Sequence, residues 1–183
     1  MGILLAFAPF LAFAVLDRFL GPAEALAAAA AVSAALILRD LAGARRGVKL
    51  LEAGTFALFA GLALYTWLSG TEWSVIGVRL CVDAGLLLVV LASMAAGQPF
   101  TLQYARDQVA PEFWDRPEFI RTNYVITGVW ALAFAVIVLA ELALLYVPGL
   151  PQSAGIIVIV LALVAAVKFT GWYPERQKRR ATG

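Results

Sequence analysis

Histidine is absent from this chain of 183 residues, and cysteine occurs once, at Cys81. Without histidine, the chain can form no His-ligated haem, no His-containing zinc or iron site and no histidine general base. A single cysteine allows no internal disulfide. The sequence also lacks a glycine-rich phosphate loop and a Gly-x-Ser-x-Gly nucleophile motif. We therefore expect no metal, no cofactor and no enzymatic activity.

Charge is scarce as well. Charged residues make up 14% of the chain and hydrophobic residues 63%, and the mean hydropathy is +0.89. Soluble domains usually contain about 25% charged and about 45–50% apolar residues. So little polar material cannot solvate the surface of a globular domain. The composition predicts an all-α, polytopic membrane helix bundle.

Six apolar runs are long enough to cross a bilayer, which requires about 20 residues of helix. They lack the polar alternation of barrel strands. The predicted spans are residues 3–20, 23–41, 50–68, 73–96, 123–147 and 153–172, with a connector at 97–122. No separate soluble domain fits in the remainder, so residues 1–183 form one integral-membrane domain.

The cationic side chains fall on one side of this predicted membrane protein. All but two of the 14 Lys and Arg residues lie at or beyond the ends of spans two, four and six. The exceptions are Arg18, at the outer end of span one, and Arg79, inside span four. Because cationic loops are retained in the cytoplasm, the asymmetry predicts that both termini are cytoplasmic and that the chain lies in a bacterial inner membrane.

Small residues recur at helical spacing in spans two and three. Such stripes allow helix backbones to approach closely in a bilayer, where van der Waals contact drives association. We therefore expect helix contacts at two stripes: Ala27, Ala31 and Ala35, and Ala53, Ala57 and Gly61.

Away from the span ends, the ionisable residues inside predicted spans are Arg79 and Asp83 in span four and Glu141 in span five. A charge near the membrane centre costs about 2.5–3.5 kcal/mol on insertion scales, so these groups need partners. Arg79 and Asp83 share a helix face, and Glu141 joins them if the two spans touch. The cluster either fixes helix register or relays protons or ions. We favour the structural role, because there is no histidine and no interrupted helix.

Two further charges lie near span ends. Glu52 is expected to pair with Lys49 or to face the headgroups. Lys168 is expected to extend its ammonium group to the interface.

The connector 97–122 is the most distinctive segment. Pro99 suits the first turn of a helix, and Leu102, Ala105 and Val109 then share one face. This pattern predicts a short amphipathic helix on the membrane surface between spans four and five. The aromatic and charged residues of the segment favour either a simple tether or a docking site for a partner. The candidate docking residues are Tyr104, Arg106, Trp114 and Arg116.

Several short patterns resemble the intracellular septation protein A family of small bacterial inner-membrane proteins. They are FAPFLAF at residues 7–13, the alanine-rich span two with the basic turn after it, the Gly-Gln-Pro break at 97–99, PEFW at 111–114, Asn123, and Trp130 with Ala131. Members are similar in length and number of spans. The resemblance implies a role in cell division and envelope maintenance, through contacts with other membrane proteins rather than through catalysis. It supplies no catalytic residue.

The sequence therefore predicts an inner-membrane protein of envelope or septation function, and a small transporter or channel using Arg79, Asp83 and Glu141 is the alternative. The expected partners are the lipid bilayer and other membrane proteins, with a homo-oligomer left open. The basic residues 176–180 suit anionic headgroups and require no nucleic acid.

Overall fold

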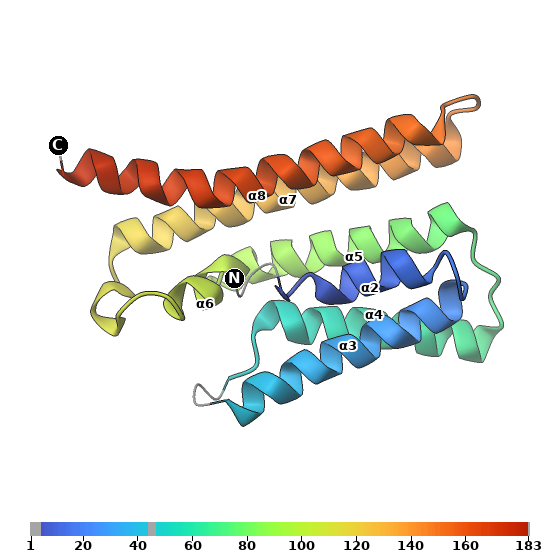
Figure 1. The fold of residues 1–183 in the computed structure, drawn as a ribbon, viewed down its shortest axis with the longest axis horizontal. Helices are drawn as coiled ribbons and strands as arrows, with labels where there is room; N and C mark the ends of the chain where they lie inside the picture. The colour runs from blue at the N-terminus through green and yellow to red at the C-terminus, as the bar shows by residue number, and fades with distance from the viewer. Residues whose placement is uncertain (1–4, 44–46, 183) are drawn as a thin grey trace. The chain divides into compact units, whose positions relative to one another are not determined.

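The computed structural model describes residues 5–43 and 47–182, with side chains described as far as residue 177 (Figure 1). Across these residues the regular secondary structure is helical, without strands. The chain forms two compact units, Met1–Val89 and Val90–Gly183, and α5 runs from one into the other.

The first unit contains α2 (Ala8–Leu16), α3 (Pro22–Ala42), α4 (Leu50–Ser69) and most of α5 (Val75–Ala95). The boundaries of the last three lie within about two residues of the predicted spans. Proline and glycine account for two of the boundaries. Pro22 occupies the first turn of α3, where its missing N–H costs nothing. Gly70 ends α4 with a φ of 63°, a left-handed conformation that favours glycine.

Among the described residues, five helices are long and apolar enough to cross a membrane: α3, α4, α5, α7 (Pro117–Tyr146), and residues Gln152–Gln177 of α8 (Gln152–Thr182). The expectation of an all-helical membrane protein is confirmed at this level. The first predicted span differs, because α2 has only nine residues. At 1.5 Å per residue it is about 14 Å long, against a hydrocarbon core of about 30 Å.

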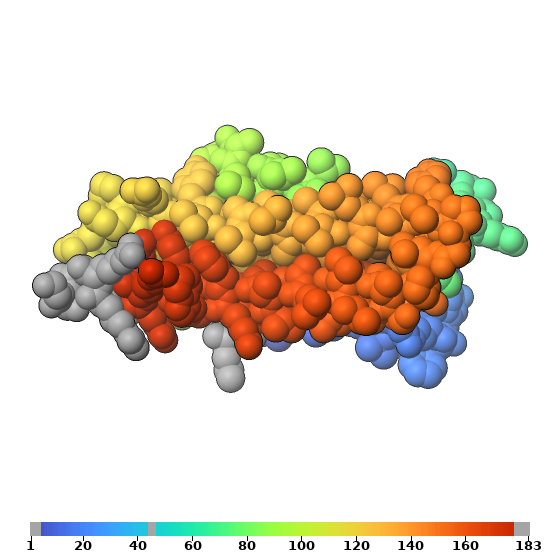
Figure 2. Space-filling model, turned by 90° about the horizontal axis from the view of Figure 1, so that it is seen from above, coloured from blue at the N-terminus to red at the C-terminus, as the bar shows by residue number. Residues whose placement is uncertain are grey.

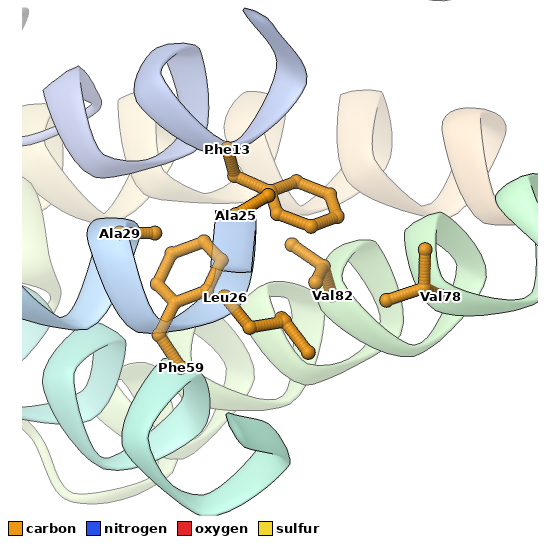
Figure 3. Close-up of a cluster of buried hydrophobic side chains, with 7 residues drawn as sticks. All are labelled: Phe13, Ala25, Leu26, Ala29, Phe59, Val78 and Val82. Atoms are coloured by element: carbon orange, nitrogen blue, oxygen red, sulfur yellow. The ribbon is translucent and has the colours of Figure 1, made fainter. Parts of the chain in front are cut away.

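Side chains from four helices form the core of the first unit (Figure 3). Phe59 of α4 lies at its centre, with ring centroids 5.7 Å from Phe13 and 5.0 Å from Phe10 of α2. From α3, Leu26 and small alanines complete the cluster, and Val78 and Val82 add one face of α5. The small α3 residues leave room for the large rings, so α2, α3 and α5 pack around Phe59 of α4.

The helices α4 and α5 approach closely at two reciprocal glycines. A Cβ built on Gly54 of α4 would lie 2.6 Å from Val89 Cγ1 of α5. A Cβ built on Gly85 of α5 would likewise clash with Leu58 of α4. Each helix therefore presents a notch to a side chain of the other. The predicted stripe misplaces this contact, because Ala57 and Gly61 are exposed and no atom lies within 4 Å of a Cβ at Gly61.

The second unit contains the end of α5, α6 (Phe100–Arg106), the 3₁₀ helix η1 (Pro111–Phe113), α7 and α8. The predicted connector 97–122 is thus partly helical. It is also shorter than expected, because Pro117 begins α7 with Glu118 in the first turn. The last helix is longer than predicted, since α8 continues through Pro174 to Thr182.

The helices α7 and α8 form an antiparallel hairpin (Figures 1 and 2). Trp130 of α7 is 2% exposed and donates a hydrogen bond from Nε1 to Thr170 Oγ1 of α8, at 2.9 Å. That hydroxyl donates in turn to the carbonyl of Ala166, at 2.8 Å. Near the other end of the hairpin, Leu144 fills the notch at Gly155. Contacts at both ends therefore fix the register of the two helices.

Candidate functional site

The half-buried Arg79 of the first unit pairs with a carboxylate that sequence analysis did not assign to it. Arg79 Nη2 of α5 lies 3.4 Å from Asp17 Oδ2, directly after α2. The side chain of Asp17 is 1% exposed and that of Arg79 is 23% exposed. Asp17 Oδ1 is buried and makes no hydrogen bond with the described residues. The ion pair therefore joins α2 to α5, where the apolar surroundings strengthen the attraction.

The other two members of the predicted cluster lie on α5 and α7. Asp83 lies half-buried on α5, one turn beyond Arg79. Glu141 lies on α7 in the second unit and is 3% exposed. The structure thus brings Arg79 together with Asp17, and it places Glu141 as a buried ionisable group in its own unit.

A second set of charged side chains lies where α3 ends and α4 begins in the first unit. Asp40 Oδ1 of α3 lies 2.6 Å from Arg39 Nη2, and Asp40 Oδ2 pairs with Lys49, directly before α4. Lys49 Nζ is also 4.0 Å from Oε1 of Glu52, which is 3% exposed. The expected Lys49–Glu52 pair is therefore present at the limit of ion-pair distance. These contacts tie the end of α3 to the start of α4.

In the second unit, a glycine turn positions α6 against α7. Gly97 has a φ of 74° and ends α5, and Gln98 N donates to the carbonyl of Ser93, at 3.0 Å. The buried hydroxyl of Ser93 then accepts a hydrogen bond from Phe100 N, at 3.1 Å. This turn satisfies backbone groups at the end of α5 and directs the chain straight into α6.

Hydrogen bonds between buried hydroxyl groups and a backbone carbonyl join α6 to α7. Thr101 Oγ1 donates to the carbonyl of Asn123 at 3.0 Å and lies 2.8 Å from Thr127 Oγ1. The three residues are at most 3% exposed. Because a buried hydroxyl without a partner costs free energy, these bonds fix the rotation of α6 on α7.

The buried face of α6 differs from the predicted one. Leu102, expected to face the membrane, is 4% exposed, and Tyr104 is 3% exposed. Phe100 packs between the rings of Tyr104 and Trp130, with both centroid distances at 6.5 Å. The amphipathic pattern of α6 therefore reflects packing on α7. Tyr104, a predicted docking residue, lies inside this packing.

The other predicted docking residues lie on the segment that follows α6. Arg106 stacks over the ring of Trp114, with 5.5 Å from Cζ to the ring centroid, and Trp114 Nε1 donates to the carbonyl of Val109. Arg116 is exposed and stacks over Phe113 at 4.4 Å. Phe113 is 37% exposed. The two cation–π pairs therefore hold the aromatic and arginine side chains of this loop in fixed positions.

Sequence reasoning missed Asp17 and Thr101 for different reasons. Asp17 lies near the end of the first apolar run, and its position there does not indicate which later helix supplies its partner. Nothing in the sequence indicated that Thr101 joins two helices, because a threonine hydroxyl bonds equally well to a carbonyl of its own helix or to a neighbouring helix.

No three Cys, Asp or Glu side chains gather as a metal-binding group within residues 5–43 and 47–182. Comparison with known proteins finds no matching family model, no matching curated protein and no matching solved structure, so the resemblance to intracellular septation protein A stays a prediction.

Proposed function

We propose that this chain is an integral membrane protein that acts by binding other membrane proteins rather than by catalysis. The observation that carries the proposal is the loop after α6, in which Phe113 and Arg116 form an exposed cation–π pair. Aromatic and arginine side chains contribute most to protein interfaces. A loop that served only as a tether would need neither.

The buried charges support the same function. Arg79 already has a buried carboxylate partner in Asp17. A neutralised pair of this kind fixes the packing of α2 on α5, and it leaves Arg79 less suited to binding a transported ion.

The proposed membrane arrangement has six spans, with residues 3–20 as the first and both termini in the cytoplasm of a bacterial inner membrane. Asp17 near the end of this run is neutralised by Arg79. The interfacial contact predicted for α6 is assigned instead to the following loop, where Phe113 and Trp114 suit the headgroup boundary.

Photo-crosslinking in native membranes tests the interaction. A photoreactive amino acid at position 113 or 116 is expected to give one discrete protein product, since both side chains are exposed. The same group at Ile157, exposed on α8, should give mainly lipid products. Arg116→Gln should reduce crosslinking from position 113, and Arg121→Gln, which removes an exposed arginine of α7, should not.

A product formed with a second copy of the chain would identify a homo-oligomer as the partner. Only lipid products at positions 113 and 116 would count against the proposal.

We assign the interaction to envelope maintenance or cell division, on the patterns shared with the septation family. Depletion of the protein should then produce elongated or misshapen cells, and a fluorescent fusion should concentrate at division sites. Uniform membrane fluorescence together with normal cell shape after depletion would remove this assignment and leave the binding function intact.

Burial of Glu141 favours one alternative, a small transporter or channel. An ionisable group that is 3% exposed in an apolar span commonly marks an ion or proton pathway. The alternative predicts flux in proteoliposomes that Glu141→Gln or Asp83→Asn abolishes without loss of stability. Absence of flux in the wild type would dismiss it.

A further inference from the structure

One face of α8 carries cationic and aromatic side chains at the end of its apolar stretch. Lys168, Trp172 and Arg176 follow one another at intervals of four residues, so they lie on one face over two helical turns. Below them, Ala165 and Leu161 continue the same face toward the middle of the helix, and Leu161 is 63% exposed. The face therefore changes from apolar to cationic along its length.

This face is held outward by the opposite side of the helix. Thr170 is two residues from Lys168, about 200° around the helix, and its hydroxyl accepts the hydrogen bond from Trp130 of α7. Ala166, on the same inner side, is 1% exposed. Figure 2 shows α8 lying lengthwise beside α7. The α7 contact thus fixes the rotation of α8 and leaves Lys168 exposed.

The side chains around Lys168 are ordered by contacts with one another. Arg176 stacks over Trp172 at 4.9 Å, and Phe169 lies 5.8 Å from Trp172 and stacks on Tyr173 at 5.1 Å. Together Ala165, Lys168, Phe169 and Trp172 line an open hollow of about 470 Å³. The hollow is open along the helix, so it suits a molecule that lies on the helix surface.

The charges on this face of α8, and its position along the helix, indicate what kind of molecule binds there. Lys168 makes no ion pair with any described residue, and Arg176 contacts the Trp172 ring rather than a carboxylate. Glu175 is exposed nearby and lowers the local positive charge by one. Lys168 lies sixteen residues from the start of α8, about 24 Å along the axis, which is near the far boundary of the hydrocarbon. Phospholipid phosphates lie just beyond that boundary.

We propose that this face binds one anionic phospholipid. Lys168 and Arg176 hold the phosphodiester, the rings of Phe169 and Trp172 contact the glycerol region, and one acyl chain follows Ala165 and Leu161. The apolar continuation distinguishes the site from one for free phosphate, since a soluble anion would gain nothing from it.

Native mass spectrometry of the full chain in detergent tests the site, with phosphatidylglycerol and phosphatidylcholine as probes. One phosphatidylglycerol should remain bound at concentrations at which phosphatidylcholine does not. Each cation near the membrane surface is worth about a fivefold change in affinity. Lys168→Gln and Arg176→Gln should therefore each weaken binding about fivefold, and the double variant about 25-fold.

Two further measurements distinguish a specific lipid site from a general attraction between the cationic protein surface and anionic lipid. Arg121→Gln removes an equal charge from an exposed position on α7 and should leave phosphatidylglycerol binding unchanged. Trp172→Ala should weaken binding, and Trp172→Phe should restore most of it. Inorganic phosphate should not displace the lipid. Displacement by phosphate, equal retention of phosphatidylcholine, or full binding by a folded Lys168→Gln/Arg176→Gln variant would overturn the proposal.

Discussion

Arg79, near the start of α5, lies 3.4 Å from Asp17, which directly follows α2. Asp17 follows the C-terminus of α2, where the helix dipole is unfavourable to an anion. The attraction to Arg79 offsets this unfavourable position. The pair therefore stabilises a carboxylate that α2 alone would leave in an unfavourable place.

Removing one member of this pair should destabilise the protein. Arg79→Gln leaves the Asp17 carboxylate buried without compensation, a change that costs about 3–5 kcal/mol in soluble proteins. Protonation of the carboxylate would reduce this cost in a membrane. Adding Asp17→Asn should restore much of the stability, measured by unfolding in mixed detergent. Rescue by Asp83→Asn in place of Asp17→Asn would show that Asp83 is the stronger partner.

The glycine contacts between α4 and α5 give a second prediction. Gly54→Ala places a methyl group 2.6 Å from Val89 Cγ1, and overpacking of this kind costs about 1–3 kcal/mol. Val89→Ala should compensate when combined with it, because it removes the two methyl groups that clash. Thermal unfolding in detergent measures the effect.

Gly61→Ala is the matched control on the same helix, since no atom lies within 4 Å of the added carbon. It should be neutral or slightly stabilising, because alanine favours helix over glycine. Equal losses at Gly54 and Gly61 would contradict a specific close approach.

A third prediction concerns the attachment of α6. Thr101→Val keeps the shape of the side chain but removes its bonds to Asn123 and Thr127. A buried group left unsatisfied costs about 1–3 kcal/mol, so hydrogen exchange of α6 amides should accelerate. Thr122→Val, at a half-buried position on α7, should leave the exchange of α6 unchanged. Similar acceleration in both variants would argue against the hydroxyl contact.

A fourth prediction addresses topology. In a Cys81→Ala background, single cysteines replacing Glu112 and Gln177 should be protected from an impermeant reagent in intact cells, and one replacing Glu72 should be labelled. The cationic residues at one end of the spans are the reason. A cysteine replacing Gly2 should also be protected if residues 3–20 cross the membrane. Labelling at position 2 with the other results unchanged would leave five spans.

The long apolar helices were predictable from the sequence because each stands between strong breaks. Pro22 and Gly70 mark helix ends that their backbone chemistry requires. The end of α8 was not predictable from the same chemistry. Pro174 indicated a break, yet it lies inside the helix.

Helix faces were harder to predict than helix boundaries. The stripe at Ala57 and Gly61 had the expected spacing, but the contact with α5 is made through Gly54. In a span where almost every residue is apolar, spacing alone cannot distinguish a packed face from a lipid face. The Arg79 contact with Asp17 was missed for a related reason. Partners were considered on spans four and five, while Asp17 lies 62 positions away in the chain.

The length of α8 has a mechanical consequence. Its 31 residues extend about 46 Å, which exceeds the hydrocarbon by about 15 Å. The backbone beyond the hydrocarbon is therefore a continuous extension of the helix and not a flexible linker. A fluorophore joined at Thr182 without a linker should tumble with the helix and report its tilt through high steady-state anisotropy.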